Sequence, residues 1–158
     1  MEISAKVHRS ATTRASPEEV YALLADVPRS VAHFPDLDAL TFERGAYTWR
    51  LKKLGAGPIS FQVHYAARYT CDPAARSVVW VPVAGVGNTR VSGQWRIEPA
   101  GAGTRFTLET EFALDLPLPR PLRGAAEALL HKENDRILGE YLGNLVVTMN
   151  GGDGRPRR

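Results

Sequence analysis

The chain has 158 residues, of which 44% are hydrophobic and 23% are charged, a composition typical of one globular domain with its own core. Its net charge is +3, and +2 of that charge lies in the last eight residues, Gly151–Arg158. The first 150 residues therefore carry 17 basic and 16 acidic side chains, which excludes the strongly basic surface of nucleic-acid-binding domains.

Other sequence features indicate the cellular compartment of the protein. The sequence contains no run of 18 apolar residues, so no membrane span is predicted. The first six residues lack the basic region and apolar core of a secretory signal. A single cysteine, Cys71, permits no internal disulfide and suits a reducing environment. We therefore predict a cytoplasmic protein.

The first third of the chain predicts a strand followed by two short helices. Apolar and polar residues alternate over Ile3–Thr13, the pattern of a half-buried strand. The segment Ser16–Glu19 combines a capping serine, a proline suited to the first helical position and a glutamate that completes a capping box. This helix is predicted to reach about Asp26, and a second short one covers Arg29–Phe34.

Between Leu37 and Leu116 the pattern changes to alternating strands separated by short turns rich in glycine or proline. Such a succession predicts an antiparallel meander with one face exposed to solvent. Six strands are expected, at residues 39–44, 47–52, 59–70, 77–83, 90–97 and 105–114.

The last long segment, Pro121–Met149, predicts an amphipathic helix that covers this sheet. Its apolar residues recur every three or four positions, which places them on one stripe with charged residues opposite. The stripe consists of Leu130, Ile137, Leu138, Tyr141, Leu142 and Leu145.

This order of elements is distinctive. With Ala15–Tyr21 after the first strand and Phe34-Pro35 after the short helices, it resembles the START-like, or SRPBCC, superfamily. That superfamily includes polyketide cyclases and aromatases, lipid-transfer domains and the birch-pollen-allergen family. The resemblance implies an α+β helix-grip fold, in which a curved antiparallel sheet of about seven strands wraps around the long helix and encloses an apolar cavity. The resemblance covers about Ile3 to Thr148, and we expect a single domain over residues 1–150. The glycine- and arginine-rich segment 151–158 is predicted to be a disordered basic tail.

Aromatic residues on the apolar faces of the strands are candidates for the cavity wall, with ordinary core packing as the alternative. Either pocket function predicts a cavity of roughly 300 Å³ or more. The strand candidates are Trp49, Phe61, Tyr65, Trp95, Phe106 and Phe112.

Three further residues add polar groups to this candidate ligand site. Asn134 and Tyr141 fall on the apolar side of the long helix, where a buried amide must find a hydrogen bond. Asn134 therefore bonds to a backbone group at a strand edge, lies at the margin of the apolar stripe, or serves as a polar anchor inside the cavity. His33 lies next to Phe34-Pro35, near the predicted cavity mouth, although a structural role is the alternative.

Catalytic, metal and cofactor motifs are weak. The glycine-rich segments 54–58 and 85–88 lack the Gly-Lys-Ser/Thr ending of a phosphate loop and predict turns. The four histidines lack metal-ligand spacing, so we expect no metal site and no cofactor. Glu109 and Glu111 share a strand face with Arg105, which favours a solvated face with cross-strand partners such as Arg96 over an acid–base pair. No catalytic residue can be named.

Three functions remain open. The first is binding or transport of an apolar small molecule, such as a lipid, polyketide, quinone or isoprenoid-like compound. The second is a cyclase or aromatase that uses the same cavity, supported by the resemblance alone. The third is an interaction module with a filled core, for which a homodimer is left open. The three arginines of the tail are too few to predict stable membrane anchoring.

Overall fold

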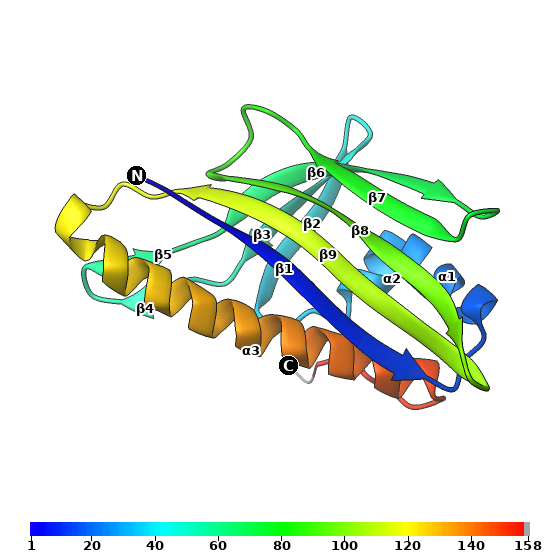
Figure 1. Ribbon diagram of the computed structural model, residues 1–158. Helices are drawn as coiled ribbons and strands as arrows, with labels where there is room; N and C mark the ends of the chain where they lie inside the picture. Colours follow the sequence, from blue (N-terminus) through cyan, green and yellow to red (C-terminus); the bar gives the residue numbers. More distant parts are fainter. Residues whose placement is uncertain (157–158) are drawn as a thin grey trace.

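The computed structural model describes residues 1–156, which form one curved sheet with a long helix packed along it (Figure 1). The bounds of the elements are β1 (Glu2–Thr13), α1 (Pro17–Ala25), α2 (Val27–Val31), β2 (Leu37–Glu43), β3 (Ala46–Leu51), β4 (Leu54–Ala56), β5 (Ile59–Phe61), β6 (His64–Asp72), β7 (Ser77–Pro82), β8 (Thr89–Ala100), β9 (Gly103–Asp115), the 3₁₀ turn η1 (Arg120–Leu122) and α3 (Arg123–Met149).

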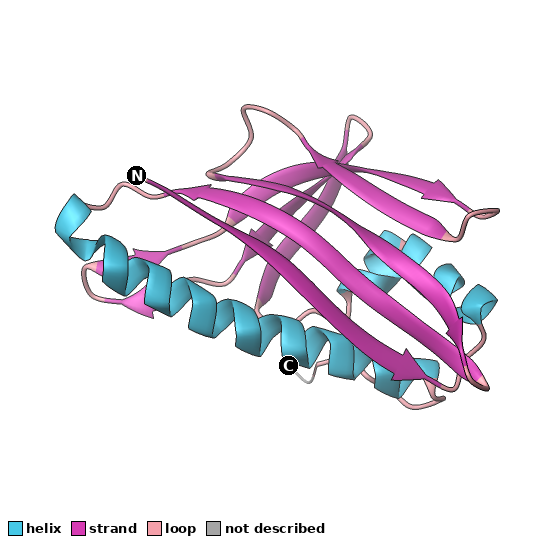
Figure 2. Ribbon diagram, viewed as in Figure 1, coloured by secondary structure: helices cyan, strands magenta, loops and turns pink. Residues whose placement is uncertain are grey.

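The main sheet has seven antiparallel strands in the order β1-β9-β8-β7-β6-β3-β2. Only β1 departs from a simple meander, because it pairs with β9 from Glu2↔Asp115 to Thr13↔Thr104. The sheet curves over α3, while α1 and α2 lie at one end of the molecule (Figure 2). The predicted α+β helix-grip fold and its seven-stranded sheet are confirmed.

The strand expected at residues 59–70 is divided in two, which corrects the sequence prediction. Its first part, β5, pairs with β4 in a separate two-stranded sheet, and only β6 joins the main sheet. The side chain of Asn88 occupies the break, because it accepts from His64 N (3.1 Å) and donates to Gln62 O (2.7 Å). Gly55 and Gly57, with positive φ angles, lie in the β4–β5 hairpin that the glycine-rich segment predicted.

Side-chain caps fix the two short helices. Ser16 Oγ accepts from Glu19 N at 3.2 Å, as the capping box predicted. The second helix begins at Val27 rather than Arg29, because Asp26 accepts from Arg29 N at 3.3 Å and thereby serves as its N-cap. The chain turns out of this helix through His33 and Phe34 before β2 begins.

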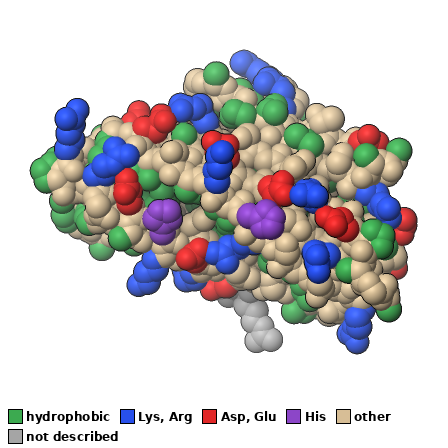
Figure 3. Space-filling model, viewed as in Figure 1, with side chains coloured by type: hydrophobic (Ala, Val, Ile, Leu, Met, Phe, Trp, Pro, Cys, Tyr) green, Lys and Arg blue, Asp and Glu red, His purple; other side chains and the backbone are tan. Residues whose placement is uncertain are grey.

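The apolar face of α3 is buried against the sheet, as predicted. Its buried residues are Ala126, Leu130, Ile137, Leu138, Tyr141, Leu142 and Leu145. No helix within residues 1–156 is both long and apolar enough to cross a membrane. On the face formed by β1 and β9, acidic and basic side chains are interspersed (Figure 3).

The chain after α3 turns back along the helix. Gly154 is buried there, and its N–H donates to Thr148 Oγ1 at 2.9 Å. Asp153 pairs with Arg155 in the same segment, which holds the pKa of this carboxyl at about 2, below its usual range. Arg157 and Arg158, which the predicted tail also included, lie outside the described residues.

Candidate functional site

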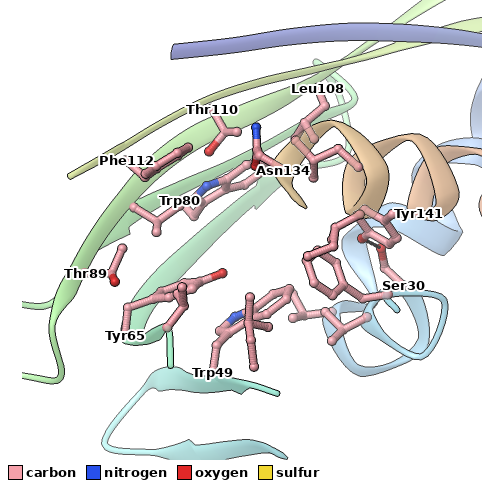
Figure 4. Close-up of a pocket in the computed structure, with 18 of the residues that line it drawn as sticks. Ser30, Trp49, Tyr65, Trp80, Thr89, Leu108, Thr110, Phe112, Asn134 and Tyr141 are labelled. Carbon is pink, nitrogen blue, oxygen red and sulfur yellow. Dashed lines mark hydrogen bonds between the residues drawn. The ribbon is translucent and has the colours of Figure 1, made fainter. Parts of the chain in front are cut away.

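A cavity of about 140 Å³ lies between the concave face of the sheet and α3, with residues of α1 and α2 at one end (Figure 4). Its wall is mostly aliphatic and aromatic. The residues that line it are Leu24, Val27, Ser30, Val31, Phe34, Trp49, Leu51, Leu54, Val63, Tyr65, Tyr69, Trp80, Thr89, Val91, Trp95, Leu108, Thr110, Phe112, Leu114, Leu130, Asn134, Ile137, Leu138 and Tyr141.

This cavity is smaller than the roughly 300 Å³ expected from the sequence, so the size prediction was wrong. Large aromatic side chains fill the concave face. The rings of Trp80 and Trp95 lie 6.3 Å apart, and Trp95 also packs against Tyr141 at 6.0 Å. A void of about 150 Å³ accommodates a benzene-sized ligand. The cavity therefore suits a compound of one or two small rings, and a long acyl chain does not fit unless the walls move.

Most of the site residues predicted from the sequence meet in this wall. Six of the nine lie there, from four strands and α3: Trp49, Tyr65, Trp95, Phe112, Asn134 and Tyr141.

The other three, Phe61, Phe106 and His33, are not among the lining residues. Phe61 lies outside the main sheet, because the strand break places it in the small β4–β5 sheet. Phe106 is fully buried behind the wall, with its ring 5.9 Å from that of Trp95. These two residues contribute to the core that supports the cavity.

His33 is excluded from the cavity by its own hydrogen bonds. Its Nδ1 lies 3.0 Å from Arg29 O and 3.2 Å from Ser30 O. Since a carbonyl oxygen only accepts, Nδ1 carries the proton, and Nε2 accepts from the Thr148 hydroxyl at 2.6 Å. Asn144 Nδ2 also donates to the His33 backbone oxygen at 3.0 Å. His33 thus joins α2 to the end of α3.

A second bond joins the same helices at the cavity wall. The hydroxyls of Ser30 and Tyr141 share a hydrogen bond of 2.6 Å, and the Phe34 ring packs edge-on against Tyr141 at 5.0 Å. Burial raises the pKa of Tyr141, and the Ser30 hydrogen bond opposes part of that rise. We refer to Ser30, His33, Tyr141, Asn144 and Thr148 as the closing network.

The Trp49 end of the cavity has polar groups without such partners. Trp49 is 4% exposed, and its Nε1 has no hydrogen-bond partner among the described residues. Its ring stacks on Tyr65 at 5.5 Å with an interplanar angle of 16°. Figure 4 shows the Tyr65 hydroxyl pointing into the space between the sheet and α3.

Tyr65 and Tyr69 remain neutral in this surrounding. Burial raises the pKa of both hydroxyls well above the usual value for tyrosine. The indole N–H of Trp49 lies close to the Tyr69 hydroxyl and opposes part of the rise in the pKa of Tyr69. The polar groups of this end are therefore uncharged.

Three other polar residues face the cavity from the sheet and from α3. The Thr89 hydroxyl donates to Asn88 Oδ1 at 2.8 Å, and the Thr110 hydroxyl donates to Ser92 O at 3.0 Å. Asn134, in contrast, makes no side-chain hydrogen bond within residues 1–156 and is half-buried. Figure 4 shows its amide directed toward the sheet side of the cavity, near Thr110.

Sequence reasoning missed Ser30, Tyr69 and Trp80 as wall residues. Tyr69 continues the alternation that begins at Tyr65, so its place on the inner face was detectable. Trp80 lies in an almost continuous apolar run, where alternation does not separate the two faces. Ser30 lies in the short helix α2, where no apolar periodicity indicated which residues face inward.

The paired carboxylates lie outside the cavity, on the outer face of the sheet. Glu109 accepts from Gln94 at 2.7 Å and from Arg96 at 3.0 Å. Both hydrogen bonds lower the pKa of Glu109, and the one from Gln94 has the larger effect. The predicted cross-strand arginine partner is confirmed. Within residues 1–156, no aspartate, glutamate, lysine, arginine or histidine lines the cavity. The described residues also contain no cluster of three or more His, Cys, Asp or Glu side chains able to hold a metal ion.

Comparisons with known structures agree with this architecture. A protein of Thermus thermophilus is 21% identical with a TM-score of 0.68, covering 91% of this chain and 98% of that one. A Streptomyces aromatase/cyclase is 22% identical with a TM-score of 0.64, covering 95% and 99%. A START superfamily protein of Mycobacterium smegmatis is 14% identical with a TM-score of 0.63, covering 92% and 99%. At these identities the likeness concerns the fold.

Sequence comparison adds the family. No curated protein sequence matches the chain. The family model described as polyketide cyclase / dehydrase and lipid transport matches residues 4–148, which is nearly the whole chain. The chain therefore belongs to the polyketide cyclase / dehydrase and lipid transport family.

Proposed function

We propose that the protein binds a small apolar molecule in the cavity between the sheet and α3. The observation that carries this proposal is the cavity itself, an apolar space of about 140 Å³ with a few inward-facing polar groups. Pockets of this composition are typical small-molecule sites. The family, whose description includes lipid transport, supports the same class of function.

The volume narrows the ligand classes expected from the sequence. A single-ring quinone is close in size to the benzene-sized ligand that a cavity of this volume holds. Lipids and extended isoprenoids need a larger space. Their transport by this protein requires outward movement of the wall.

A cyclase or dehydrase activity has weaker support. The family description and the Streptomyces aromatase/cyclase favour it. General acid–base catalysis works best with a group whose pKa lies near the working pH. The wall residues that the structure describes are all neutral, and burial moves the pKa of Tyr65 and Tyr141 away from that range. The chemistry of the wall therefore supports binding over catalysis.

Calorimetric titration with indane, a compact bicyclic hydrocarbon, tests the proposal. Val91 lines the cavity, so Val91→Phe places a ring inside it and is expected to weaken indane binding at least tenfold. Val79 lies on a neighbouring strand but is 36% exposed and does not line the cavity. Val79→Phe is therefore the matched control and keeps the wild-type affinity.

Native mass spectrometry of the purified protein provides an independent test. A co-purifying small molecule that Val91→Phe loses and Val79→Phe keeps supports binding in this cavity. The proposal fails if the wild-type protein binds neither indane nor any other compact apolar compound. It also fails if both phenylalanine variants reduce binding equally, because binding then does not depend on the cavity.

A further inference from the structure

The segment that follows α3 makes specific contacts with the rest of the fold. The chain leaves the helix at Asn150 and turns back along it through Gly151, whose φ angle is 97°. The side chain of Asn150 accepts from Thr13 Oγ1 at 2.7 Å and from Arg14 N at 3.0 Å. These bonds tie the turn to the end of β1. We refer to residues 150–155 as the strap.

Two glycines of the strap lie where a side chain has no room. A Cβ atom on Gly154 would lie 1.7 Å from the backbone oxygen of Asn144, and one on Gly152 would lie 2.9 Å from the side chain of Val147. Both neighbours belong to α3, so the strap packs directly on that helix, and Gly154 is buried there. Glycine is required at position 154, because a Cβ atom would push the strap away from α3.

The strap is joined to the closing network at Thr148. The Thr148 hydroxyl oxygen accepts from Gly154 N at 2.9 Å, and the same hydroxyl donates to His33 Nε2 at 2.6 Å. Asp153 also lies near His33. The bonds from Arg155 are the main cause of the low pKa of Asp153, and the imidazole of His33 adds to it. One hydroxyl group therefore connects the strap to the end of α2.

We propose that the strap controls the opening of the cavity, by acting through Thr148 to hold α2 closed against α3. Val27, Ser30 and Val31 of α2 line the cavity. The rest of the wall belongs mainly to paired strands and to the long helix, whereas α2 has only five residues. It is therefore the part of the wall that moves at the lowest cost. The proposal concerns the protein without ligand, so a failure of indane binding leaves it unaffected.

Release of the strap weakens the hold on α2. Thr148 then loses Gly154 as a donor, and water competes for the bond between Thr148 and His33. In the closed protein His33 is only 2% exposed, so this bond is shielded. The other bonds of the closing network remain. We therefore expect α2 to open more often while the sheet stays folded.

Hydrogen exchange measures this opening directly. The amides of Ala32, His33 and Phe34 donate to backbone oxygens of α2, so they exchange when α2 opens. Gly154→Ala and removal of residues 151–158 both detach the strap. Each is expected to speed exchange at these three amides about tenfold, the effect of one lost hydrogen bond. Amides of the β4–β5 hairpin, which is separate from the strap, are expected to keep their rates.

Two further variants control for side effects. Gly139→Ala adds the same methyl group at a position of α3 with open space around it, so it is not expected to speed exchange at α2. Thr148→Val removes the hydroxyl that joins the strap to His33. It is expected to speed exchange at α2, and adding Gly154→Ala in this background should change the rate by less than about twofold.

The wild-type protein alone also tests the proposal. Its α2 amides are expected to exchange faster than the slowest amides of β8 and β9, because α2 opens locally. Equal rates would show that α2 opens only when the whole domain unfolds, and would overturn the proposal.

The variants provide two more ways to overturn it. Unchanged α2 exchange in both strap variants would show that the strap contributes to overall stability without controlling α2. Fully additive effects of Gly154→Ala and Thr148→Val would show that the strap does not act through the closing network.

Discussion

The two ends of the space under α3 use buried polar groups in opposite ways. In the closing network, the imidazole of His33 bonds to Thr148 and to backbone oxygens, and the Ser30 and Tyr141 hydroxyls bond to each other. At the other end, the Trp49 N–H has no partner among the described residues, and neither has the amide of Asn134.

This difference separates groups that hold the fold from groups available to a ligand. A buried donor with a protein partner contributes to stability, and its removal leaves that partner unsatisfied. A donor without a partner contributes little to stability and can contribute to binding. We therefore expect changes in the closing network to reduce stability, and changes at the Trp49 end to alter recognition.

High pH is expected to give the largest effect. Burial raises the pKa of Tyr65, Tyr69 and Tyr141 above the value of about 10 that tyrosine has in the unfolded chain. Above pH 10 the unfolded state therefore loses protons that the folded state keeps, and the free energy of unfolding falls as pH rises toward the folded-state pKa values. The expected slope is roughly 1 kcal/mol per pH unit for each tyrosine.

Chemical denaturation from pH 8 to pH 11 measures this slope. Below pH 9.5 the tyrosines should contribute no change in the free energy of unfolding. Above pH 10, Tyr65→Phe should make the decline shallower. If water fills the cavity, Tyr65 ionises near pH 10 in the folded protein. The decline is then the same in Tyr65→Phe as in the wild type, which would contradict the raised pKa of Tyr65.

His33→Ala is expected to give the next largest effect. It removes the bonds to Thr148 and to the α2 carbonyls and leaves a void, because His33 is only 2% exposed. A loss of about 2–4 kcal/mol in the free energy of unfolding should follow. His131→Ala, on the exposed side of α3, is the matched control and should stay within about 0.5 kcal/mol.

The same variant also separates stability from binding. At a temperature where His33→Ala is folded, its indane affinity should match that of the wild type, since His33 does not line the cavity. A large loss of affinity without a loss of stability would place His33 in the ligand site after all, as the sequence had predicted.

Two asparagines on α3 provide the smallest and most direct comparison. Asn144 donates to His33 O at 3.0 Å, so Asn144→Leu leaves that oxygen unpaired and should cost about 1–2 kcal/mol of stability. Asn134 has no such bond among the described residues, and Asn134→Leu should change stability by less than about 0.5 kcal/mol. Equal losses in urea denaturation would show that the two amides are equally structural.

Periodicity and capping predicted most of the fold because they are local properties. The alternation of strands, the Ser16 cap and the apolar stripe of α3 all follow from residues close together in the sequence. The break between β5 and β6 did not follow. It depends on the side chain of Asn88, which is more than 20 residues away from the strand it interrupts.

The sequence predicted those residues of the candidate site that lie on the inner faces of strands. Trp49 and Tyr65 were expected there, but their stacking and the unpaired N–H depend on how β3 and β6 pair. His33 was assigned to the cavity from its neighbours in sequence. Its actual partner, Thr148, is 115 residues away, and no local pattern indicates that bond.

The most direct test of small-molecule binding in this cavity is a ¹H–¹⁵N titration of the wild-type protein with 1-indanone. All three tryptophans, Trp49, Trp80 and Trp95, line the cavity, so their indole signals report on the same space. Binding in the cavity predicts saturable shifts of all three indole signals. Saturable binding by calorimetry with no change in any indole signal would show that the ligand site lies elsewhere.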